Sequence, residues 1–159
     1  MAIRQIVKAS SAEGLKTLTT KSVPYNFIKD IKTNPIDEII EDLRDTLMSE
    51  ETGVGIAGNQ IDINVRIFAT MYSGRFKVFI NPELRALSDD FVDFKESCLS
   101  HPGVETLKRR HKSLILRWKT AKNRICIRRF EGFMAIVIQH EMDHLAGKFC
   151  LDGPATGGA

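Results

Sequence analysis

Apolar residues recur at helical spacing directly after Asn34, at Ile36, Ile39, Ile40, Leu43 and Leu47. Pro35 suits the first turn of a helix, Asn34 can act as its N-terminal cap, and the acidic residues that follow suit the positive end of the helix dipole. The helical pattern ends before Gly53, a residue typical of turns. The pattern therefore predicts a helix between these points, with one apolar face packed against the rest of the protein.

Between Val65 and Phe130 the chain changes to short runs rich in β-branched and aromatic residues: VRIFAT, FKVFI, FVDFKE, SLILRW and RICIRRF. Ser-Gly, Asn-Pro and Ser-Asp-Asp breaks separate the runs, as expected between strands. The last two runs flank Lys119 to Asn123 and predict a hairpin. Strands this close in sequence favour antiparallel pairing over parallel crossover units.

A second helix is predicted after Gly132. Residues Phe133 to Ile138 are apolar on every side, which is typical of a helix enclosed by other elements, and Gly147 suits its C-terminal end. The combined pattern predicts the α+β class, with antiparallel or mixed β-sheets packed around this central helix.

Length and composition narrow the class of protein. A chain of 159 residues with 43% hydrophobic content is expected to form one domain over residues 1–159, with 152–159 as a flexible tail. The N-terminal segment lacks the apolar stretch of a secretory signal, so we expect a cytoplasmic protein with no membrane partner. A net charge of +3 permits an anionic partner without requiring one, and no DNA partner is predicted. Three cysteines in such a chain argue against a disulfide framework.

The candidate chemistry lies in Gln139-His140-Glu141-Met142-Asp143-His144. Histidines four residues apart share one face of a helix, so His140 and His144 can bind one metal ion with Glu141 beside it. A carboxylate next to an ion-bound water can accept its proton during attack on a carbonyl, which makes Glu141 a candidate general base. A capping histidine and a core histidine are the alternative, but the paired spacing on a predicted helix favours a metallohydrolase site.

A catalytic site of this kind usually has three protein ligands, and two cysteines compete for the third position. Cys150 falls where HExxHxxGxxH metalloproteases of the metzincin type place their last histidine. Cys98 follows a predicted strand, whose end can present a thiolate to a distant helix. Spacing alone leaves both open.

Three segments, GVGIAGNQ at 53–60, ESCLS at 96–100 and QHEMDHLAG at 139–147, resemble in order and separation the signature motifs of peptide deformylases. The resemblance implies a hydrolase that removes the formyl group from the N-terminal formylmethionine of nascent polypeptides and releases formate. It also implies one divalent metal ion per chain, iron(II) in the cell, with zinc, nickel or cobalt able to substitute.

Carried over by position, the resemblance assigns the metal ligands to Cys98, His140 and His144, a donor set that suits iron or zinc. Glu141 becomes the general base for the metal-bound water and later protonates the leaving amine. Under this assignment Cys150 becomes an apolar thiol without a catalytic role.

The remaining positions concern the substrate. The Gln60 side-chain amide and the Leu99 backbone N–H become donors to the oxyanion, and Gly55 becomes the point where the backbone approaches the substrate. The candidates for an apolar pocket around the methionine side chain are Val54, Phe133, Ile136 and Val137. Gln139, which precedes the first histidine, is either a partner that orients the site or a surface residue of the helix.

Two positions depart from the family pattern: Gly58 stands for an alanine and Ser97 for a glycine. Ser97 restricts the backbone beside Cys98, which puts substrate preference in question more than activity. The chain resembles the short organellar or phage-encoded deformylases that lack a C-terminal helix. Its basic region 108–129 suggests a transient contact with ribosomal RNA, although most of that region should be a solvated sheet face. A metzincin-like peptidase that uses Cys150 and a catalytically idle homologue are the rival hypotheses.

Overall fold

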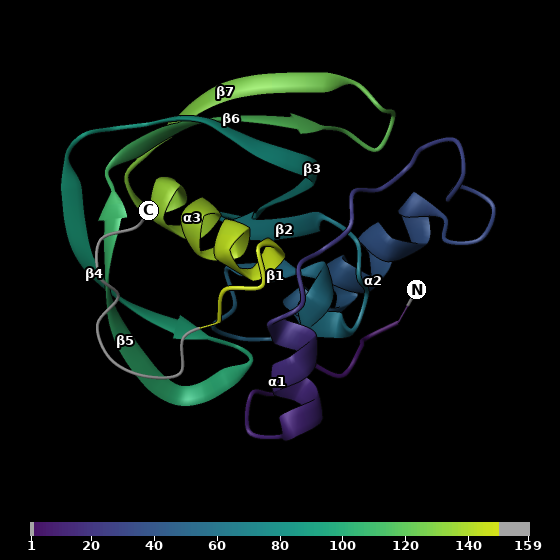
Figure 1. Ribbon diagram of the computed structural model, residues 1–159, viewed down its shortest axis with the longest axis horizontal. Helices are drawn as coiled ribbons and strands as arrows, with labels where there is room; N and C mark the ends of the chain where they lie inside the picture. Colours follow the sequence, from purple (N-terminus) through teal and green to yellow (C-terminus); the bar gives the residue numbers. More distant parts are fainter. Residues whose placement is uncertain (1, 150–159) are drawn as a thin grey trace.

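The computed structural model describes residues 2–149. It is an α+β fold in which one helix is enclosed by strands (Figure 1). The helices are α1 (Ala12–Leu18), α2 (Ile36–Met48), the 3₁₀ helix η1 (Gly58–Ile61) and α3 (Phe133–Leu145). The strands are β1 (Gly55–Ala57), β2 (Ile67–Tyr72), β3 (Arg75–Leu87), β4 (Phe91–Cys98), β5 (His101–His111), β6 (Ser113–Lys119) and β7 (Ile125–Glu131). The predicted fold class is confirmed.

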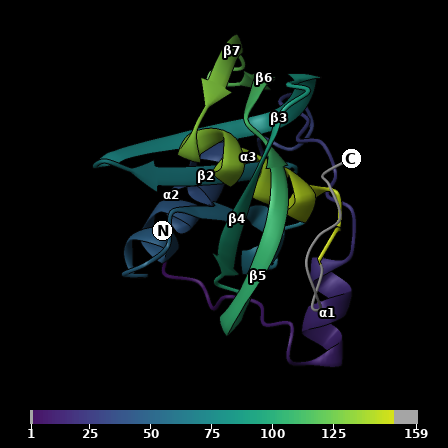
Figure 2. The ribbon, with the colours of Figure 1, turned by 90° about the vertical axis from the view of Figure 1, so that its left-hand side faces the viewer.

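The strands form two separate sheets. One has five strands in the order β1-β2-β3-β6-β7, and the other is the β4-β5 hairpin. Every pairing between these strands is antiparallel, including the predicted hairpin of β6 and β7. The register of β3 against β6 shifts at Ile80/Glu83 and at Leu84/Ala86, and such bulges bend and twist a strand. The sheet thus curves over α3, while β4 and β5 stand beside the helix (Figures 1 and 2).

Side chains of alternate residues along a strand of the sheet pack into two different hydrophobic cores. In β2, Ile67 and Ala69 belong to the core that includes the apolar face of α2, whereas Phe68 belongs to the core that includes α3. Phe68 stacks on Phe79 with ring centroids 4.6 Å apart. This alternation follows from the period of two along a strand. The strand β2 is therefore buried on both faces.

The N-terminal part contains features that the pattern did not predict. The short helix α1 is capped by the Ser11 side chain, which accepts a hydrogen bond from the Gly14 N–H. The cap of α2 is Pro35, not Asn34 as predicted. Asn34 instead belongs to the preceding turn, where its N–H donates to the Asp30 carbonyl, and no side-chain hydrogen bond caps the helix.

No helix within residues 2–149 is both long and apolar enough to cross a membrane. Cys150 and the expected tail at 152–159 lie outside the described residues.

Candidate metal centre

The helix α3 carries His140, Glu141 and His144 into the interior. Glu141 and His144 are buried, and His140 is half-buried beside a pocket. The helix begins after Gly132, whose φ of +66° is a left-handed conformation that favours glycine. This turn lets the chain leave β7 and enter the space under the curved sheet.

The strand β4 ends at Cys98 and brings its thiol to the two histidines. The Cys98 Sγ lies 3.3 Å from the His144 Nε2, and that atom lies 3.2 Å from the His140 Nε2. All three candidate ligand atoms lie within 4.8 Å of one another. Ligands around a tetrahedral zinc-like ion are separated by about 3.4–3.8 Å, given bonds of about 2.1–2.3 Å. The geometry and the chemistry of these donors therefore suit a divalent metal ion, and among the described residues Cys98 contributes the thiol.

His140 is oriented by a buried ion-pair network. Its Nδ1 lies 2.9 Å from the Glu96 Oε1, which leaves Nε2 for the cluster. Arg110 binds the same carboxylate through Nε at 2.7 Å and Nη2 at 2.8 Å, and reaches the Asp143 Oδ2 through Nη1 at 2.6 Å. Burial alone would raise the pKa of Glu96, but the hydrogen bonds from Arg110 and His140 lower it to about 2. A carboxylate in this position fixes the ring of a metal-binding histidine.

Sequence reasoning missed this network. Arg110 was counted within a basic region expected to be mostly solvated, yet it is buried, because Glu96 and Asp143 together neutralise it. Glu96 could have been found, since it shares a strand face with Cys98 two residues later. The role of Arg110 had no local signal, because its partners come from β4 and α3.

The protonation states of the cluster depend on the same contacts. Burial lowers the pKa of His140, but hydrogen bonds with Cys98 and Glu96 raise it to about 10. Burial and the neighbouring His140 hold the pKa of His144 well below its ordinary value. A metal ion must therefore displace a proton from the cluster when it binds. Burial raises the pKa of Glu141 to about 7, so this carboxyl group can take up and release a proton near neutral pH.

The 3₁₀ helix η1 presents Gln60 to the other side of the cluster. Its Oε1 accepts from the Ala57 N–H at 2.9 Å, and this orients Nε2 toward the Ser100 Oγ at 3.1 Å and the Cys98 Sγ at 3.7 Å. The segment after Cys98 is held from outside by the N-terminal strand-like stretch. There, the Lys8 Nζ donates to the Leu99 carbonyl at 2.8 Å, and two backbone bonds link this stretch to Gln60 and Ser100.

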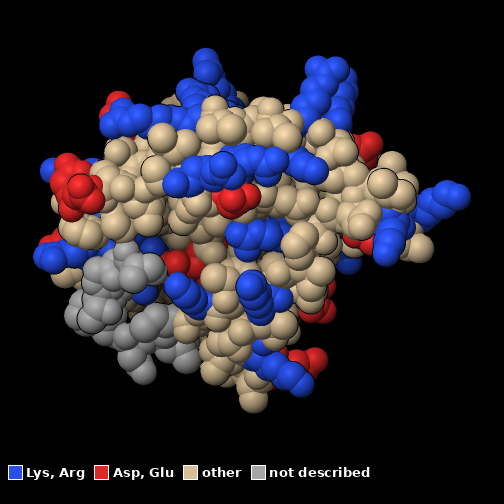
Figure 3. All heavy atoms as spheres, turned by 45° about the horizontal axis from the view of Figure 1, so that its top comes forward, with Lys and Arg blue, Asp and Glu red and all other residues tan. Residues whose placement is uncertain are grey.

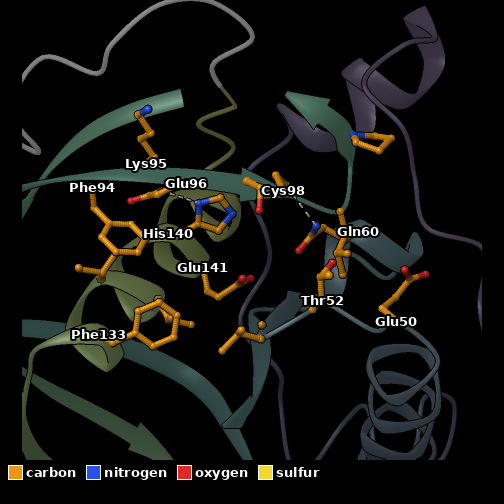
Figure 4. A pocket seen from close by; sticks show the side chains of 18 of the residues that line it. Glu50, Thr52, Gln60, Phe94, Lys95, Glu96, Cys98, Phe133, His140 and Glu141 are labelled. Carbon is orange, nitrogen blue, oxygen red and sulfur yellow. Dashed lines mark hydrogen bonds and ion pairs between the residues drawn. The ribbon is translucent and has the colours of Figure 1, made fainter. Parts of the chain in front are cut away.

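These groups surround a pocket of about 330 Å³ (Figure 4). Among the described residues, the wall contains every candidate ligand, catalytic and substrate-binding residue expected from the sequence except His144, which lines a second, smaller pocket together with Cys98 and His140. The pocket also includes residues that were not expected, notably Phe94, Glu50, Thr52 and Lys95. In Figure 4, Phe94 and Phe133 lie at one end, Gln60 and Cys98 at the other, with Glu141 between them.

Two further residues show why small or amide side chains are needed here. A Cβ at Gly55 would lie 2.6 Å from the Glu141 Oε1, so only glycine leaves this carboxylate its position. Gln139 is buried, not a surface residue. Its amide donates to the His111 carbonyl and accepts from the His111 N–H, which joins α3 to β5.

Comparison with known proteins agrees with this architecture. The family model for polypeptide deformylase matches residues 3–156. The peptide deformylase of Caulobacter vibrioides is 32% identical over 157 residues, which cover 96% of this chain and 88% of the relative. That of Dictyoglomus turgidum is 38% identical over 132 residues, covering 81% and 86% of the two chains. A solved peptide deformylase from Acinetobacter baumannii with bound Met-Ala-Ser has a TM-score of 0.82 at 23% identity, covering 92% and 94%.

The fold and the site define a hydrolase whose buried helix and strand end converge on a Cys-His-His cluster at a pocket. The chain belongs to the peptide deformylase family. It is therefore a hydrolase of the class that removes an N-terminal formyl group.

Proposed function

We propose that this chain is a metal-dependent hydrolase that removes the formyl group from the N-terminal formylmethionine of nascent polypeptides and releases formate. The observation that carries the proposal is the cluster of Cys98, His140 and His144 in contact with the pocket that contains Glu141 and Gln60. We further propose one ion per chain, iron(II) in the cell, with zinc, nickel or cobalt able to substitute. The match over residues 3–156 supports a single catalytic domain.

When bound, the ion would activate water as a nucleophile and polarise the formyl carbonyl. Glu141 accepts the proton of the attacking water and later delivers one to the leaving amine. The Gln60 Nε2 and the Leu99 backbone N–H donate hydrogen bonds to the oxygen of the formyl group as negative charge develops on it. The position of Gln60 is held by the bond between its Oε1 and the Ala57 N–H, so little reorganisation is needed during the reaction.

The substrate binds along the pocket with its methionine side chain among Val54, Phe133, Ile136 and Val137. The peptide backbone passes Gly55, where the lack of a side chain allows close approach. The bound Met-Ala-Ser in the Acinetobacter baumannii structure supports a peptide substrate for this fold.

The test is formate release from a formyl-Met-Ala peptide by metal-loaded protein prepared without oxygen. We expect activity in the wild-type protein and in Cys150→Ala, and its loss in Cys98→Ala. Full activity of Cys98→Ala would contradict the ligand assignment. Cleavage of casein without formate release would instead support a peptidase that uses Cys150, and inactivity in both assays would support a catalytically idle homologue.

We also propose a transient contact with ribosomal RNA through the basic region 108–129. Lys and Arg side chains extend over the face formed by β3, β6 and β7, with few acidic groups among them (Figure 3). Arg110 is excluded from this surface because it is buried in the ion-pair network. Co-sedimentation with ribosomes should be lost as salt rises and weakened in a Lys122→Ala/Arg124→Ala variant. Absence of co-sedimentation at low salt would contradict the contact.

A further inference from the structure

The strand β4 and the helix α3 run alongside each other, and three contacts follow one another along both. Phe94 packs on Phe133 with ring centroids 5.8 Å apart. Glu96 then bonds His140, and Cys98 approaches His144. Residues 94, 96 and 98 share one face of the strand, because side chains alternate with a period of two. The aromatic pair is therefore built on the same two elements as the metal centre.

This arrangement places the aromatic pair at a fixed distance from the reacting end of the pocket. Phe133 precedes His140 by two turns of helix, which is roughly 10 Å along the axis. Phe94 precedes Cys98 by four residues of strand, or roughly 13 Å. Phe133 is also braced from behind by Tyr72, whose ring centroid lies 5.2 Å away. The pair forms the end of the pocket opposite Gln60 (Figure 4).

Beyond the aromatic pair lies a second, more open hollow of about 620 Å³. Phe94, Phe133 and Ile136 line this hollow as well as the catalytic pocket. Its other walls include Val92 near the start of β4, Lys112 between β5 and β6, and Arg129 near the end of β7. These three shared side chains thus form a partition, a single layer of side chains that separates the catalytic pocket from the second hollow.

We propose that Phe94, packed on Phe133, sets the maximum length of the first side chain that the enzyme accepts, by closing the pocket off from the second hollow. This inference rests on the proposed function. The methionine side chain has four heavy atoms and spans roughly 5 Å when extended, so it ends before the partition. A longer unbranched chain meets the rings. Phe94 comes from β4, is not one of the candidate metal ligands and acts on specificity.

The experiment compares formate release from formyl-Met-Ala with release from formyl-2-aminooctanoyl-Ala, whose side chain is two heavy atoms longer. Each methylene that a pocket fails to accommodate costs about 10–200-fold in kcat/KM. The wild-type protein should prefer the methionine peptide by at least about 10-fold. In Phe94→Ala the second hollow becomes continuous with the pocket, and the preference should fall by about 10-fold or more. Phe94→Leu should fall between the two.

Phe91→Ala is the matched control, because Phe91 lies on the same strand and packs on His111, outside both hollows. It should keep the wild-type preference. Equal kcat/KM for both peptides in the wild-type protein, or an equal change in the Phe91 and Phe94 variants, would overturn the inference while leaving the proposed function intact. Absence of formate release from both peptides in the wild-type protein would overturn the proposed function and the inference together.

Discussion

At the scale of single residues, the site depends on residues that position the candidate metal ligands and the candidate general base. Glu96 contacts no substrate in the proposed reaction, yet it binds both His140 and Arg110. Gly55 contributes no side chain, and its value lies in the space that it leaves to Glu141. Ser97, the departure from the family pattern, is exposed at the pocket wall, so its side chain does not disturb the packing around Cys98.

Replacing Glu96 by glutamine should weaken metal binding. The amide keeps the size of the side chain but removes the charge that orients His140 and pairs with Arg110. Loss of such a supporting partner typically costs 10–100-fold in metal affinity. Competition with a chelator measures this affinity, with Glu105→Gln on the exposed side of β5 as control. Equal affinities in the two variants would show that the Glu96 contact does not support the metal centre.

Gly55→Ala should impair turnover without loss of the metal. The new Cβ would lie 2.6 Å from the Glu141 Oε1, so the carboxylate must move. A displacement of about 1 Å at a catalytic group can cost about 100-fold in rate. Formate release and metal content should be measured on the same sample. Activity within a few-fold of wild type would contradict the proposed position of Glu141.

At the scale of elements, features set by local interactions could be predicted from the sequence, and features set by contacts between distant segments could not. The helices α2 and α3 and the β6-β7 hairpin could be predicted, because their patterns and turns are local. The helix α1 could not, since its seven residues carry no amphipathic repeat and depend on the Ser11 cap and on packing. The pair of histidines was visible for the same local reason. Spacing alone could not predict that Cys98 lies beside these histidines, because this contact joins a strand and a helix that are distant in sequence; the resemblance to the family indicated Cys98.

The helix α1 packs closely against the N-terminal stretch at Gly14, which lies beside the Lys8 backbone. A Cβ there would lie 1.9 Å from the Lys8 carbonyl oxygen, so Gly14→Ala must separate the two segments. Overpacking of this kind costs about 1–3 kcal/mol of unfolding free energy. Urea unfolding should show the loss, and exposed Lys16→Ala on the same helix should show little change. Equal stability of the two variants would be inconsistent with this contact.

The helix α2 anchors the N-terminus through Asp42, which accepts hydrogen bonds from the Ala2 N–H and the Arg4 Nε. Burial raises the pKa of Asp42, but these bonds outweigh it and leave the pKa below its ordinary value of 3.8. The unfolded chain therefore binds the proton first, so the stabilisation is complete above pH 3.8 and is lost as pH falls through the lower folded value.

Asp42→Asn should accordingly lower the unfolding free energy at neutral pH by about 1 kcal/mol, a modest value because Arg4 is half exposed and solvent screens the pair. The difference from wild type should shrink as the pH is lowered below 3.8. Urea unfolding of both proteins at several pH values measures it. A difference that does not change with pH would exclude this role of the Asp42 charge.

At the scale of the whole molecule, the curved sheet makes the site possible. Two cores pack on its opposite faces, and α3 occupies the space beneath the curve. Segments near residues 54–60, 94–100 and 133–141 then meet at one pocket, although long stretches of chain separate them. The sequence motifs could indicate which segments matter, but the ion-pair network and the aromatic partition arise only from their assembly.

The central claim is that Cys98, with His140 and His144, binds one catalytic metal ion. The most direct measurement is the absorption spectrum of the cobalt(II)-loaded protein, in which a thiolate ligand produces a sulfur-to-metal charge-transfer band. We predict this band, with one cobalt per chain, in the wild-type protein and in Cys126→Ala, and its loss in Cys98→Ser. A band that persists unchanged in Cys98→Ser would contradict the account.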